Sequence, residues 1–372
     1  MSSWLIIFGI IFIIAIIALL FRIQKLLRIV KGKKEEADNT DERVNKTNPT
    51  NAILMLAFVV IGLILIIWYS FGNFDKYQLP IASEHGLKID NLFWITTGIT
   101  GFVFILTNVL LFYFSYKYRY KKEKKALYYP DNVKLEIAWT LIPAVVLTLL
   151  VIGGLQTWRS VMREAPKDAE VVEILGFQFA WRARYPGPDN QLGAYDYRRI
   201  TPVNEFGLNF EDKAAFDDFI PREIYLPVNK PVVFKIRARD VLHSVFAPHF
   251  RLKMDAVPGM PTQFWFVPNK TTKEMRAELN NPEFNYEIAC AEVCGRGHYS
   301  MRIIVVVVEE PEYQTWLAQQ KSFLSNNPDL MSQVPENLKE LAYTVTGLSP
   351  ETEQVEVETA GILEDTVGVA VN

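Results

Sequence analysis

Long apolar runs dominate the first part of the chain, whereas short apolar stretches alternate with polar residues in the remainder. A helix needs roughly 20 mainly apolar residues to cross the hydrocarbon core of a membrane. Four runs come close to this length, and all of them lie before residue 160: Trp4–Phe21, Ala52–Phe71, Leu92–Tyr116 and Ile137–Leu155. We therefore predict that residues 1–160 form a membrane domain with four transmembrane helices.

The first run also has to be compared with a cleavable signal peptide. Such a peptide begins with a positively charged segment and ends in small residues at its cleavage site. Here the first three residues contain no Lys or Arg, and the run ends in Leu20 and Phe21. We therefore predict a helix that is retained.

Positive charges beside the apolar runs predict the orientation, because loops rich in Lys and Arg stay on the cytoplasmic side. Residues 25–34 carry five such side chains and residues 117–125 carry six, whereas residues 72–91 carry only Lys76 and Lys88. The first and third connections are thus predicted to be cytoplasmic. The N-terminus and everything after the fourth run should then lie on the extracytoplasmic side, which for a bacterial inner membrane is the periplasm.

Beyond Arg159 the short runs are interrupted by Pro, Gly and Asn, which is typical of an all-β sandwich or barrel. We predict strands in five stretches: 171–179, 223–236, 263–267, 286–289 and 302–308. Residues 161–312 are accordingly expected to form an extracytoplasmic β domain. Residues 186–221 are polar and show no clear periodicity, which indicates a surface excursion.

The end of the chain has a different composition. A short amphipathic helix is predicted over Glu312–Leu324, and the residues that follow are acidic and poor in aromatic side chains. Such a composition supplies little apolar surface to bury. We therefore expect residues 313–372 to form a short helix and an acidic tail with little core of their own.

Composition narrows the classes of function. Half of the residues are hydrophobic, 22% are charged and the formal net charge is -3. Binding to nucleic acid needs a basic excess that neutralises phosphates, so nucleic acid is not expected as a partner. The chain has only two cysteines, Cys290 and Cys294, and no Cys-x-x-Cys-His sequence. A disulfide framework and a covalently attached c-type haem are therefore excluded, and metal ligation or chance remain.

The two cysteines open a short run of metal-binding side chains. Cys290, Cys294, His298 and Met301 supply two thiolates, an imidazole and a thioether. This donor set is typical of electron-transfer copper sites, whereas structural zinc is held by four strong nitrogen or sulfur ligands. A second imidazole is needed from elsewhere, and His243 follows a predicted strand, where a sandwich presents loop residues. The alternative is a pair of buried free cysteines beside unrelated polar residues, and it leaves the spacing unexplained.

The spacing Cys-x-Glu-x-Cys-Gly-x-x-His-x-x-Met resembles the CuA motif of the cytochrome c oxidase subunit II family. The resemblance implies a cupredoxin-like Greek-key sandwich that holds a dinuclear copper centre. It also implies a role for each ligand: Cys290 and Cys294 bridge both ions, His243 and His298 are terminal ligands, and Met301 and the carbonyl of Glu292 are weak ones. In the family, the side chain at Glu292 also reaches a magnesium ion at the boundary with subunit I.

The resemblance covers roughly residues 92–310. Residues 240–259 resemble the segment that brings the upstream His, and Glu136–Pro143 resembles the start of the family's second membrane helix. By this likeness Glu136 would lie at the cytoplasmic mouth of a proton pathway into subunit I. A carboxylate in the first turn of a helix is also favoured by the helix dipole alone, so both interpretations stay open.

Three features depart from the family pattern. The usual Gln-Trp-x-Trp appears as Gln178-Phe179-Ala180-Trp181, so Phe179 occupies the place of the Trp that receives electrons. Phe179 and Trp181 are therefore candidates for electron transfer, and the alternative is that they fill the sandwich core. Met260 stands where an Arg often follows Pro-Gly, and the first two apolar runs have no counterpart in the common two-helix form.

Two histidines and one acidic stretch lie outside these motifs. For His85 and His249 we expect surface or helix-end positions. The four carboxylates within Glu211–Asp218 would suit a docking patch for a basic electron donor, but a solvated loop is the favoured interpretation.

Together these features predict subunit II of a cytochrome c oxidase. A c-type cytochrome, or a complex that carries one, would supply electrons, and the haem of subunit I would use them for oxygen reduction coupled to proton pumping. Subunit I, other oxidase subunits and the lipid membrane are the expected partners. The alternative is a membrane-anchored copper carrier or oxidase assembly factor, which would expose labile Cys or Met sites. A quinol oxidase subunit of the same fold would lack the copper ligands.

Overall fold

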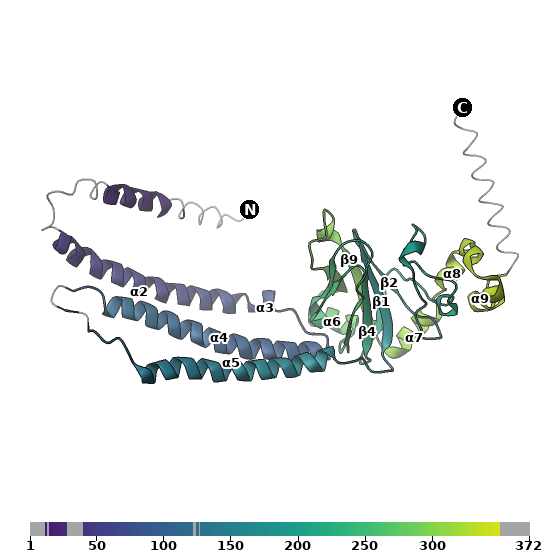
Figure 1. Cartoon of the computed structure of the whole chain (residues 1–372), viewed down its shortest axis with the longest axis horizontal. Coiled ribbons are helices and arrows are strands. Elements are labelled where there is room, and N and C mark those ends of the chain that lie inside the picture. Colours follow the sequence, from purple (N-terminus) through teal and green to yellow (C-terminus); the bar gives the residue numbers. More distant parts are fainter. Residues whose placement is uncertain (1–11, 13–14, 28–39, 122–123, 126, 350–372) are drawn as a thin grey trace, which may run out of the picture. The chain divides into compact units, whose positions relative to one another are not determined.

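The structure is a computed structural model that describes residues 12, 15–27, 40–121, 124–125 and 127–349 (Figure 1). Three of the described helices are long and apolar enough to cross a membrane: Thr47–Gly72 within α2 (Thr40–Gly72), α4 (Glu84–Lys117) and α5 (Val133–Met162). They confirm the second, third and fourth predicted spans. The first predicted span, Trp4–Phe21, lies largely outside the described residues. In this region the structure describes residues 12 and 15–27, which are helical.

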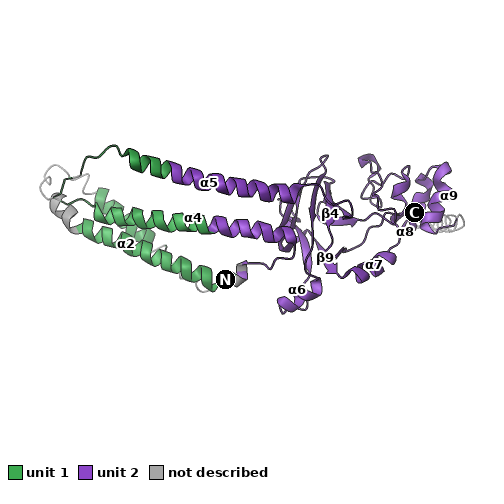
Figure 2. Cartoon of the chain, turned by 90° about the horizontal axis from the view of Figure 1, so that it is seen from below, with its two compact units in different colours: residues 1–74, 98–140 green, residues 75–97, 141–372 purple. Residues whose placement is uncertain are grey.

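The chain divides into two compact units, of which the first comprises residues 1–74 and 98–140 (Figure 2). Its helices expose large apolar side chains, as expected of helices that face lipid or a partner. Phe58 of α2 packs on Phe112 of α4 with ring centroids 5.9 Å apart, and the Asn48 amide donates to the Tyr120 carbonyl at 2.8 Å. Helices α2 and α4 therefore lie side by side within this unit.

The second unit comprises residues 75–97 and 141–372 and contains a sandwich of two sheets (Figure 1). Their strand orders are β2–β1–β4–β7 and β3–β9–β8–β5–β6. The strands are β1 (Glu170–Phe177), β2 (Ala180–Arg184), β3 (Ile224–Pro227), β4 (Val232–Ala238), β5 (His243–Ala247), β6 (Leu252–Ala256), β7 (Thr262–Phe266), β8 (Tyr286–Cys290) and β9 (Arg302–Val308). Pairs β1–β4 and β3–β9 are parallel, and the other pairs are antiparallel. The predicted sandwich is confirmed.

Alternation along each strand decides which side chains enter the core. In β4, Val232, Phe234 and Ile236 are buried between the two sheets, whereas Lys235 is exposed on the opposite face. This is the period of two that a strand imposes on its side chains. The predicted stretch 223–236 proves to contain two strands, β3 and β4, and strands β2, β5 and β6 were not predicted.

A second apolar core lies on the outer face of the β2–β1–β4–β7 sheet. Leu175 and Phe177 of β1 pack there with apolar side chains of the 186–221 excursion and of the C-terminal segment: Phe206, Leu208, Phe210, Phe216, Phe323, Leu324, Leu330 and Met331. The C-terminal segment forms α7 (Glu310–Ala318), α8 (Phe323–Asn326), η5 (Pro328–Gln333), η6 (Glu336–Leu338) and α9 (Lys339–Thr346). Its few apolar side chains thus complete a core that the sandwich begins.

This core corrects the prediction for the C-terminal segment. We expected a helix over Glu312–Leu324 and little buried core after it, but α7 ends at Ala318 and the residues from 322 to 349 bury several apolar side chains. This burial could not be predicted from the C-terminal sequence alone, because those side chains pack against residues of β1 and of the excursion. Residues 350–372 lie outside the described part of the chain.

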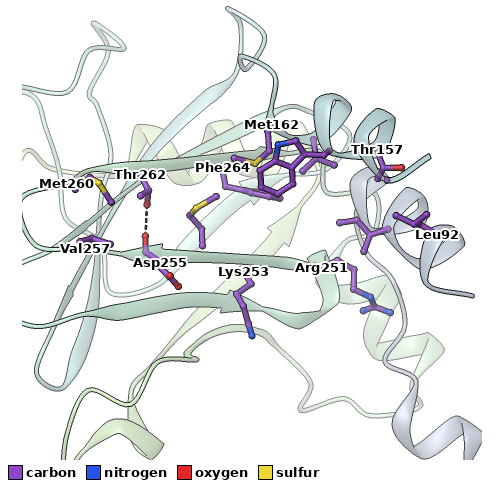
Figure 3. A pocket seen from close by; sticks show the side chains of 15 residues that line it. Leu92, Thr157, Met162, Arg251, Lys253, Asp255, Val257, Met260, Thr262 and Phe264 are labelled. Atoms are coloured by element: carbon purple, nitrogen blue, oxygen red, sulfur yellow. Dashed lines mark hydrogen bonds between the residues drawn. The ribbon is translucent and has the colours of Figure 1, made fainter. Parts of the chain in front are cut away.

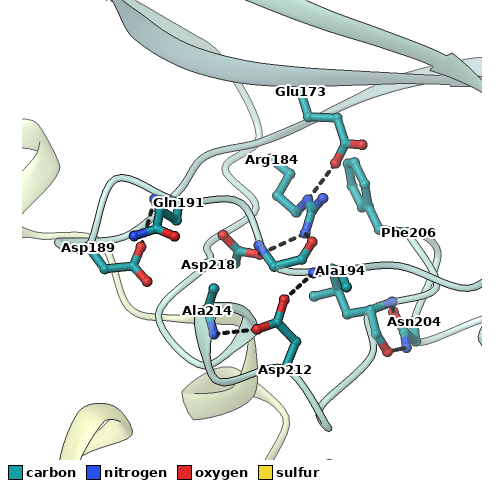
Figure 4. Close-up of polar contacts among 12 residues, drawn as sticks. Glu173, Arg184, Asp189, Gln191, Ala194, Asn204, Phe206, Asp212, Ala214 and Asp218 are labelled. Carbon is teal, nitrogen blue, oxygen red and sulfur yellow. Dashed lines mark hydrogen bonds and ion pairs between the residues drawn. The ribbon is translucent and has the colours of Figure 1, made fainter. Parts of the chain in front are cut away.

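Charged side chains lie between the same sheet and the excursion (Figure 4). Arg184, which is 1% exposed, pairs with Glu173 and donates to Asp218 at 2.7 Å, and Arg237 also pairs with Glu173. Burial raises the pKa of Asp218 to about 7, although Arg184 acts in the opposite direction. The expectation that the Glu211–Asp218 stretch is a solvated loop is therefore wrong for Asp218. We call these four residues the arginine–carboxylate cluster.

The beginning of α4 is bonded to the sandwich. Arg251 follows η3 (Pro248–Phe250), and its Nε and Nη2 donate to the two carboxylate oxygens of Asp90 at 2.7 and 2.9 Å. The Ala82 N–H donates to the His249 carbonyl at 2.8 Å. The tip of the β5–β6 hairpin is therefore fixed to the first turns of α4. A largely apolar cavity of about 650 Å³, lined in part by Trp158 and Met260, lies beside this junction (Figure 3).

Candidate metal centre

The predicted metal-binding loop connects β8 to β9. Cys290 is the last residue of β8, and Met301 immediately precedes β9. The Cys290 N–H donates to the Met301 carbonyl at 3.1 Å, so the antiparallel pair closes the loop at its base. A regular sheet therefore holds both ends of the loop.

Strand β5 brings His243 to the same end of the sheet. It pairs with β8 so that Val245 lies opposite Cys290, and the Ala291 N–H donates to the Ser244 carbonyl at 3.0 Å. His243 is the first residue of β5, and it is fully buried. Strand pairing thus places beside the loop an imidazole that is 47 residues away in the sequence.

The sulfur and nitrogen atoms of these residues lie close together. The two cysteine Sγ atoms are 3.8 Å apart, and Cys290 Sγ is 3.9 Å from His243 Nδ1. Cys294 Sγ is 3.7 Å from His298 Nδ1 and 3.9 Å from Met301 Sδ. Two donors that bind one metal ion at about 2.0–2.3 Å each are themselves separated by roughly 3–4 Å. The side chains therefore fit a metal site, and their softness favours copper.

Burial distinguishes this cluster from an exposed carrier site. Cys290 is 9% exposed, Cys294 5% and Met301 1%, so the sulfur ligands are enclosed. Burial, together with the hydrogen bond and the charge of Cys290, raises the pKa of the Cys294 thiol to about 11. At neutral pH this thiol keeps its proton until a metal displaces it. The alternative of a copper carrier expects labile exposed ligands, whereas the sulfur ligands of this cluster are enclosed.

The backbone of Glu292 also faces the cluster. Its carbonyl oxygen accepts a hydrogen bond from Cys290 Sγ at 3.2 Å, so this oxygen lies beside the sulfur atoms. The side chain of Glu292 is half-buried. The loop therefore presents a backbone oxygen in addition to its four predicted side-chain donors, and His243 is the fifth predicted side-chain donor.

Asp240 holds the imidazole of His243 in place. Its Oδ1 lies 2.9 Å from His243 Nε2, and its Oδ2 accepts from the Gln178 N–H at 2.7 Å. Burial by itself would raise the pKa of Asp240, but these hydrogen bonds hold it below its usual range. A carboxylate on one ring nitrogen directs the other nitrogen toward the metal. The sequence analysis did not predict this role of Asp240, although an acidic residue three positions before His243 could have indicated it.

Phe179 lies against the metal-binding loop. A Cβ added to Gly295 would come within 3.0 Å of its ring, and one added to Gly297 within 2.5 Å, so both glycines are needed for this contact. Gly295 also has a φ of +131°, which side-chain-bearing residues rarely adopt. Phe179 is 38% exposed, whereas Trp181 is 1% exposed and its ring centroid is 5.8 Å from that of His243. Phe179 is therefore exposed to solvent beside the loop, whereas Trp181 is buried beside His243.

The remaining predicted residues lie apart from the cluster. Glu136 is in the first turn of α5, where its Oε1 accepts from the Asn132 N–H at 3.4 Å. His85 is at the beginning of α4 as expected, but it is buried, 4.5 Å from the ring centroid of Trp265. Half-burial lowers the pKa of His249 to about 4, and its ring packs on aromatic side chains. Of the two positions expected for His85, the helix end is therefore the one that the structure shows.

Comparison with known proteins agrees with this geometry. The family described as "Cytochrome C oxidase subunit II, periplasmic domain" matches residues 171–308, and its transmembrane domain matches residues 73–157. The chain is 38% identical to the alternative cytochrome c oxidase subunit 2 of Bradyrhizobium diazoefficiens over 272 residues, which is 73% of this chain and 92% of that protein. It is 31% identical to cytochrome c oxidase subunit 2 of Cereibacter sphaeroides, over 64% of this chain and 78% of that protein.

Solved structures give a weaker match. The crystal structure of the periplasmic domain of subunit II of cytochrome oxidase from Bradyrhizobium japonicum is 25% identical, with a TM-score of 0.29. That match covers 42% of this chain and 95% of the solved domain. Helix α2 precedes the range that the transmembrane family matches.

Proposed function

The chain belongs to the cytochrome c oxidase subunit II family, and we propose that it holds a dinuclear copper centre through which the oxidase receives electrons. It is the electron-accepting subunit of a haem-copper oxidase, a membrane protein with a periplasmic domain. The observation that carries the proposal is the set of donor distances between 3.7 and 3.9 Å around the two cysteine sulfurs.

Each ligand has a distinct task in this proposal. By the resemblance to the family, the thiolates of Cys290 and Cys294 would hold both ions, His243 and His298 would each hold one, and Met301 and the Glu292 carbonyl would complete the set. When bound, the copper pair supplies a centre that accepts and releases one electron with little change in geometry. The protein keeps Nδ1 of His243 directed at the cluster through Asp240, and Phe179 packs on the loop at Gly295 and Gly297.

Three finer assignments follow from the resemblance to the family. We propose that the Glu292 side chain binds magnesium together with subunit I, and that Glu136 admits protons from the cytoplasmic side. We also propose that electrons come from a c-type cytochrome by way of Phe179, whose exposed edge and contact with the loop support this choice over the buried Trp181. Proton pumping and oxygen reduction would take place on subunit I.

Electron paramagnetic resonance of the copper-loaded full chain tests the proposal. One unpaired electron shared over two copper nuclei is the expected spectrum, and Cys294→Ser should abolish the sharing because one bridge is lost. Ser300→Ala is the matched control, since its hydroxyl bonds only to the Gly297 carbonyl in the same loop. A single-copper spectrum in the unaltered chain, or sharing that survives Cys294→Ser, would contradict the proposal.

A further inference from the structure

We infer that the connection between α4 and α5, residues 117–132, binds anionic phospholipids at the cytoplasmic surface of the membrane. The ligand class is a diacyl lipid whose phosphate headgroup carries a net negative charge. This site goes beyond the proposed function, because it involves neither the copper ligands nor the route of the electron. We call residues 117–132 the basic–aromatic connection.

The two spanning helices place this connection on the cytoplasmic side. Arg251 of the β domain pairs with Asp90 near the beginning of α4, and only residues 163–169 separate the end of α5 from β1. The β domain matches the family's periplasmic domain, so these ends of both helices lie at the periplasmic surface. Each helix is long and apolar enough to cross a membrane. Their other ends, which the basic–aromatic connection joins, therefore lie at the cytoplasmic surface.

Basic residues outnumber acidic ones along the connection. Residues 117–132 contain six Lys or Arg side chains and two carboxylates, Glu123 and Asp131. Five of the basic side chains form no ion pair within the part of the chain that the structure describes: Lys117, Arg119, Lys121, Lys124 and Lys125. The other predicted cytoplasmic connection, residues 22–48, contains eight basic and five acidic residues, so it does not reverse the sign. The basic–aromatic connection thus carries net positive charge that needs a counterpart.

A tight turn brings lysines of the connection together. The Lys124 N–H donates to the Lys121 carbonyl at 3.1 Å, and the two residues form a β-bridge. These bonds are made by the backbone, so the ammonium groups are not needed to hold the turn. The side chains of Lys124 and Lys125 are exposed. A lysine ammonium binds phosphate as a point charge, and a cluster of lysines beside a spanning helix is typical of sites for anionic lipids.

Tyrosine rings lie beside the cations at the end of α4. Lys117 Nζ is 5.5 Å from the ring centroids of Tyr113 and Tyr118. The Arg119 guanidinium is 4.6 Å from the ring centroid of Tyr116. Tyrosine is enriched at the depth of the lipid headgroups, because its ring is apolar and its hydroxyl is polar. The rings therefore hold these two cations at the depth of the lipid phosphates.

The last part of the connection exposes large apolar side chains. Leu127 is 89% exposed and Tyr128 is 88% exposed, so nothing in the described chain covers them. Apolar surface of this kind is unfavourable in water and favourable at the boundary between headgroups and acyl chains. A zwitterionic lipid would use these side chains but leave the lysines without a counterion. An anionic phospholipid matches both features of the connection.

The test measures which lipids contact the full chain in phosphatidylcholine vesicles. Spin-labelled phosphatidylglycerol and spin-labelled phosphatidylcholine are added separately, and electron paramagnetic resonance gives the immobilised fraction of each lipid. Lys121→Gln/Lys124→Gln removes two charges, whereas Lys121→Arg/Lys124→Arg retains them. Lys213→Gln/Lys273→Gln is the matched control, because both lysines are exposed in the periplasmic β domain.

We expect the unaltered chain to prefer phosphatidylglycerol, and salt should weaken this preference. The Gln pair should lower the preference by about fivefold, whereas the Arg pair and the control should leave it unchanged. Equal immobilisation of the two lipids, or a preference that survives in the Gln pair, would overturn the inference. The same comparison is made on the assembled oxidase. If the Gln pair has no effect there, another subunit covers the connection, and the inference is overturned as well.

Discussion

Two clusters of polar side chains are buried at different places in the β domain, and they differ in how their atoms are spaced. In the arginine–carboxylate cluster, opposite charges are in direct contact, as in the 2.7 Å bond between Arg184 and Asp218. In the metal cluster, the nearest donor atoms of side chains remain 3.7–3.9 Å apart. The members of the first cluster are joined by short charged hydrogen bonds, whereas those of the second lie at the separation of donors that share a metal ion.

This difference gives a physical criterion for separating structure from function. Buried polar groups must be paired, because an unpaired one costs free energy of desolvation. A cluster of paired charges is held by its own members, and breaking one pair is costly. A cluster of soft donors that is joined only by weak sulfur hydrogen bonds gains strong bonds when a metal binds. The following predictions test whether the two clusters can be disrupted independently.

The largest effect on stability is expected from Arg184→Met. Removing this side chain takes the charged partner from Asp218 and one of two arginines from Glu173, which costs about 3–5 kcal/mol of unfolding free energy. Urea unfolding of the full chain in detergent measures the loss, and the copper spectrum should not change. Arg182→Met is the control, because its pair with Glu205 is exposed and should contribute less than about 1 kcal/mol. Loss of the copper spectrum in Arg184→Met would show that the clusters are coupled.

Asp218→Asn should change how stability depends on pH. The pKa of Asp218 is about 7 in the folded chain against 3.8 as its ordinary value, so the folded state binds more protons between these values. The unaltered chain should therefore lose stability as pH rises from about 4 to about 7, by at most about 1.4 kcal/mol per pH unit. Asn cannot ionise, so the variant should lack this part of the loss.

The measurement is the free energy of unfolding of both chains across this pH range. Asp212→Asn is the control, because it also removes one negative charge from the excursion. The Asp212 carboxylate caps η2 (Lys213–Ala215) and is not a member of the arginine–carboxylate cluster. If Asp218→Asn and the unaltered chain lose stability in parallel, the buried carboxylate does not retain its proton and our account of the cluster is wrong.

The comparison also explains what the sequence could predict. The proposed ligands in the loop share one short segment with a characteristic spacing, so the sequence predicts Cys290, Cys294, His298 and Met301 together. The partners of Arg184 come from β1 and from a stretch 34 residues further along the chain, and no local spacing connects them. Asp240 lies near His243 in sequence, but its bond to Gln178 joins residues 62 apart.

The same reasoning applies to the secondary structure. Long apolar helices and the alternating strand β9 (Arg302–Val308) were predicted, because each signal is contained within the element. Strand β2 (Ala180–Arg184) was missed because two of its five residues are arginines, one of which is buried only by its distant partners. Strands β5 and β6 were missed because they are short, and the pattern of β6 is broken by Lys253 and Asp255.

Asp240→Asn should weaken the metal cluster without touching the other one. An amide still bonds to the His243 ring but no longer carries the charge that fixes its orientation, so copper affinity should fall by about 10–100-fold. Competition with a chelator of known affinity measures this change. Asp255→Asn is the control, because that carboxylate bonds to the Ser244 hydroxyl rather than to the ring. Equal losses in both variants would argue against a specific role for Asp240.

The smallest effect is expected from Thr271→Ala, which lies in neither cluster. Thr271 caps the beginning of α6 (Thr272–Glu278). Its hydroxyl accepts a hydrogen bond from the Glu274 N–H at 3.1 Å, and the Glu274 carboxylate accepts one from the Thr271 N–H at 2.8 Å. Loss of such a cap costs about 1 kcal/mol, because one N–H in the first turn loses its partner. Unfolding in urea should show this loss, while copper affinity and the pH dependence stay as in the unaltered chain. A change in copper affinity or in the pH dependence of stability would mean that the two clusters respond to general destabilisation. Their different behaviour could then not be attributed to the spacing of their atoms.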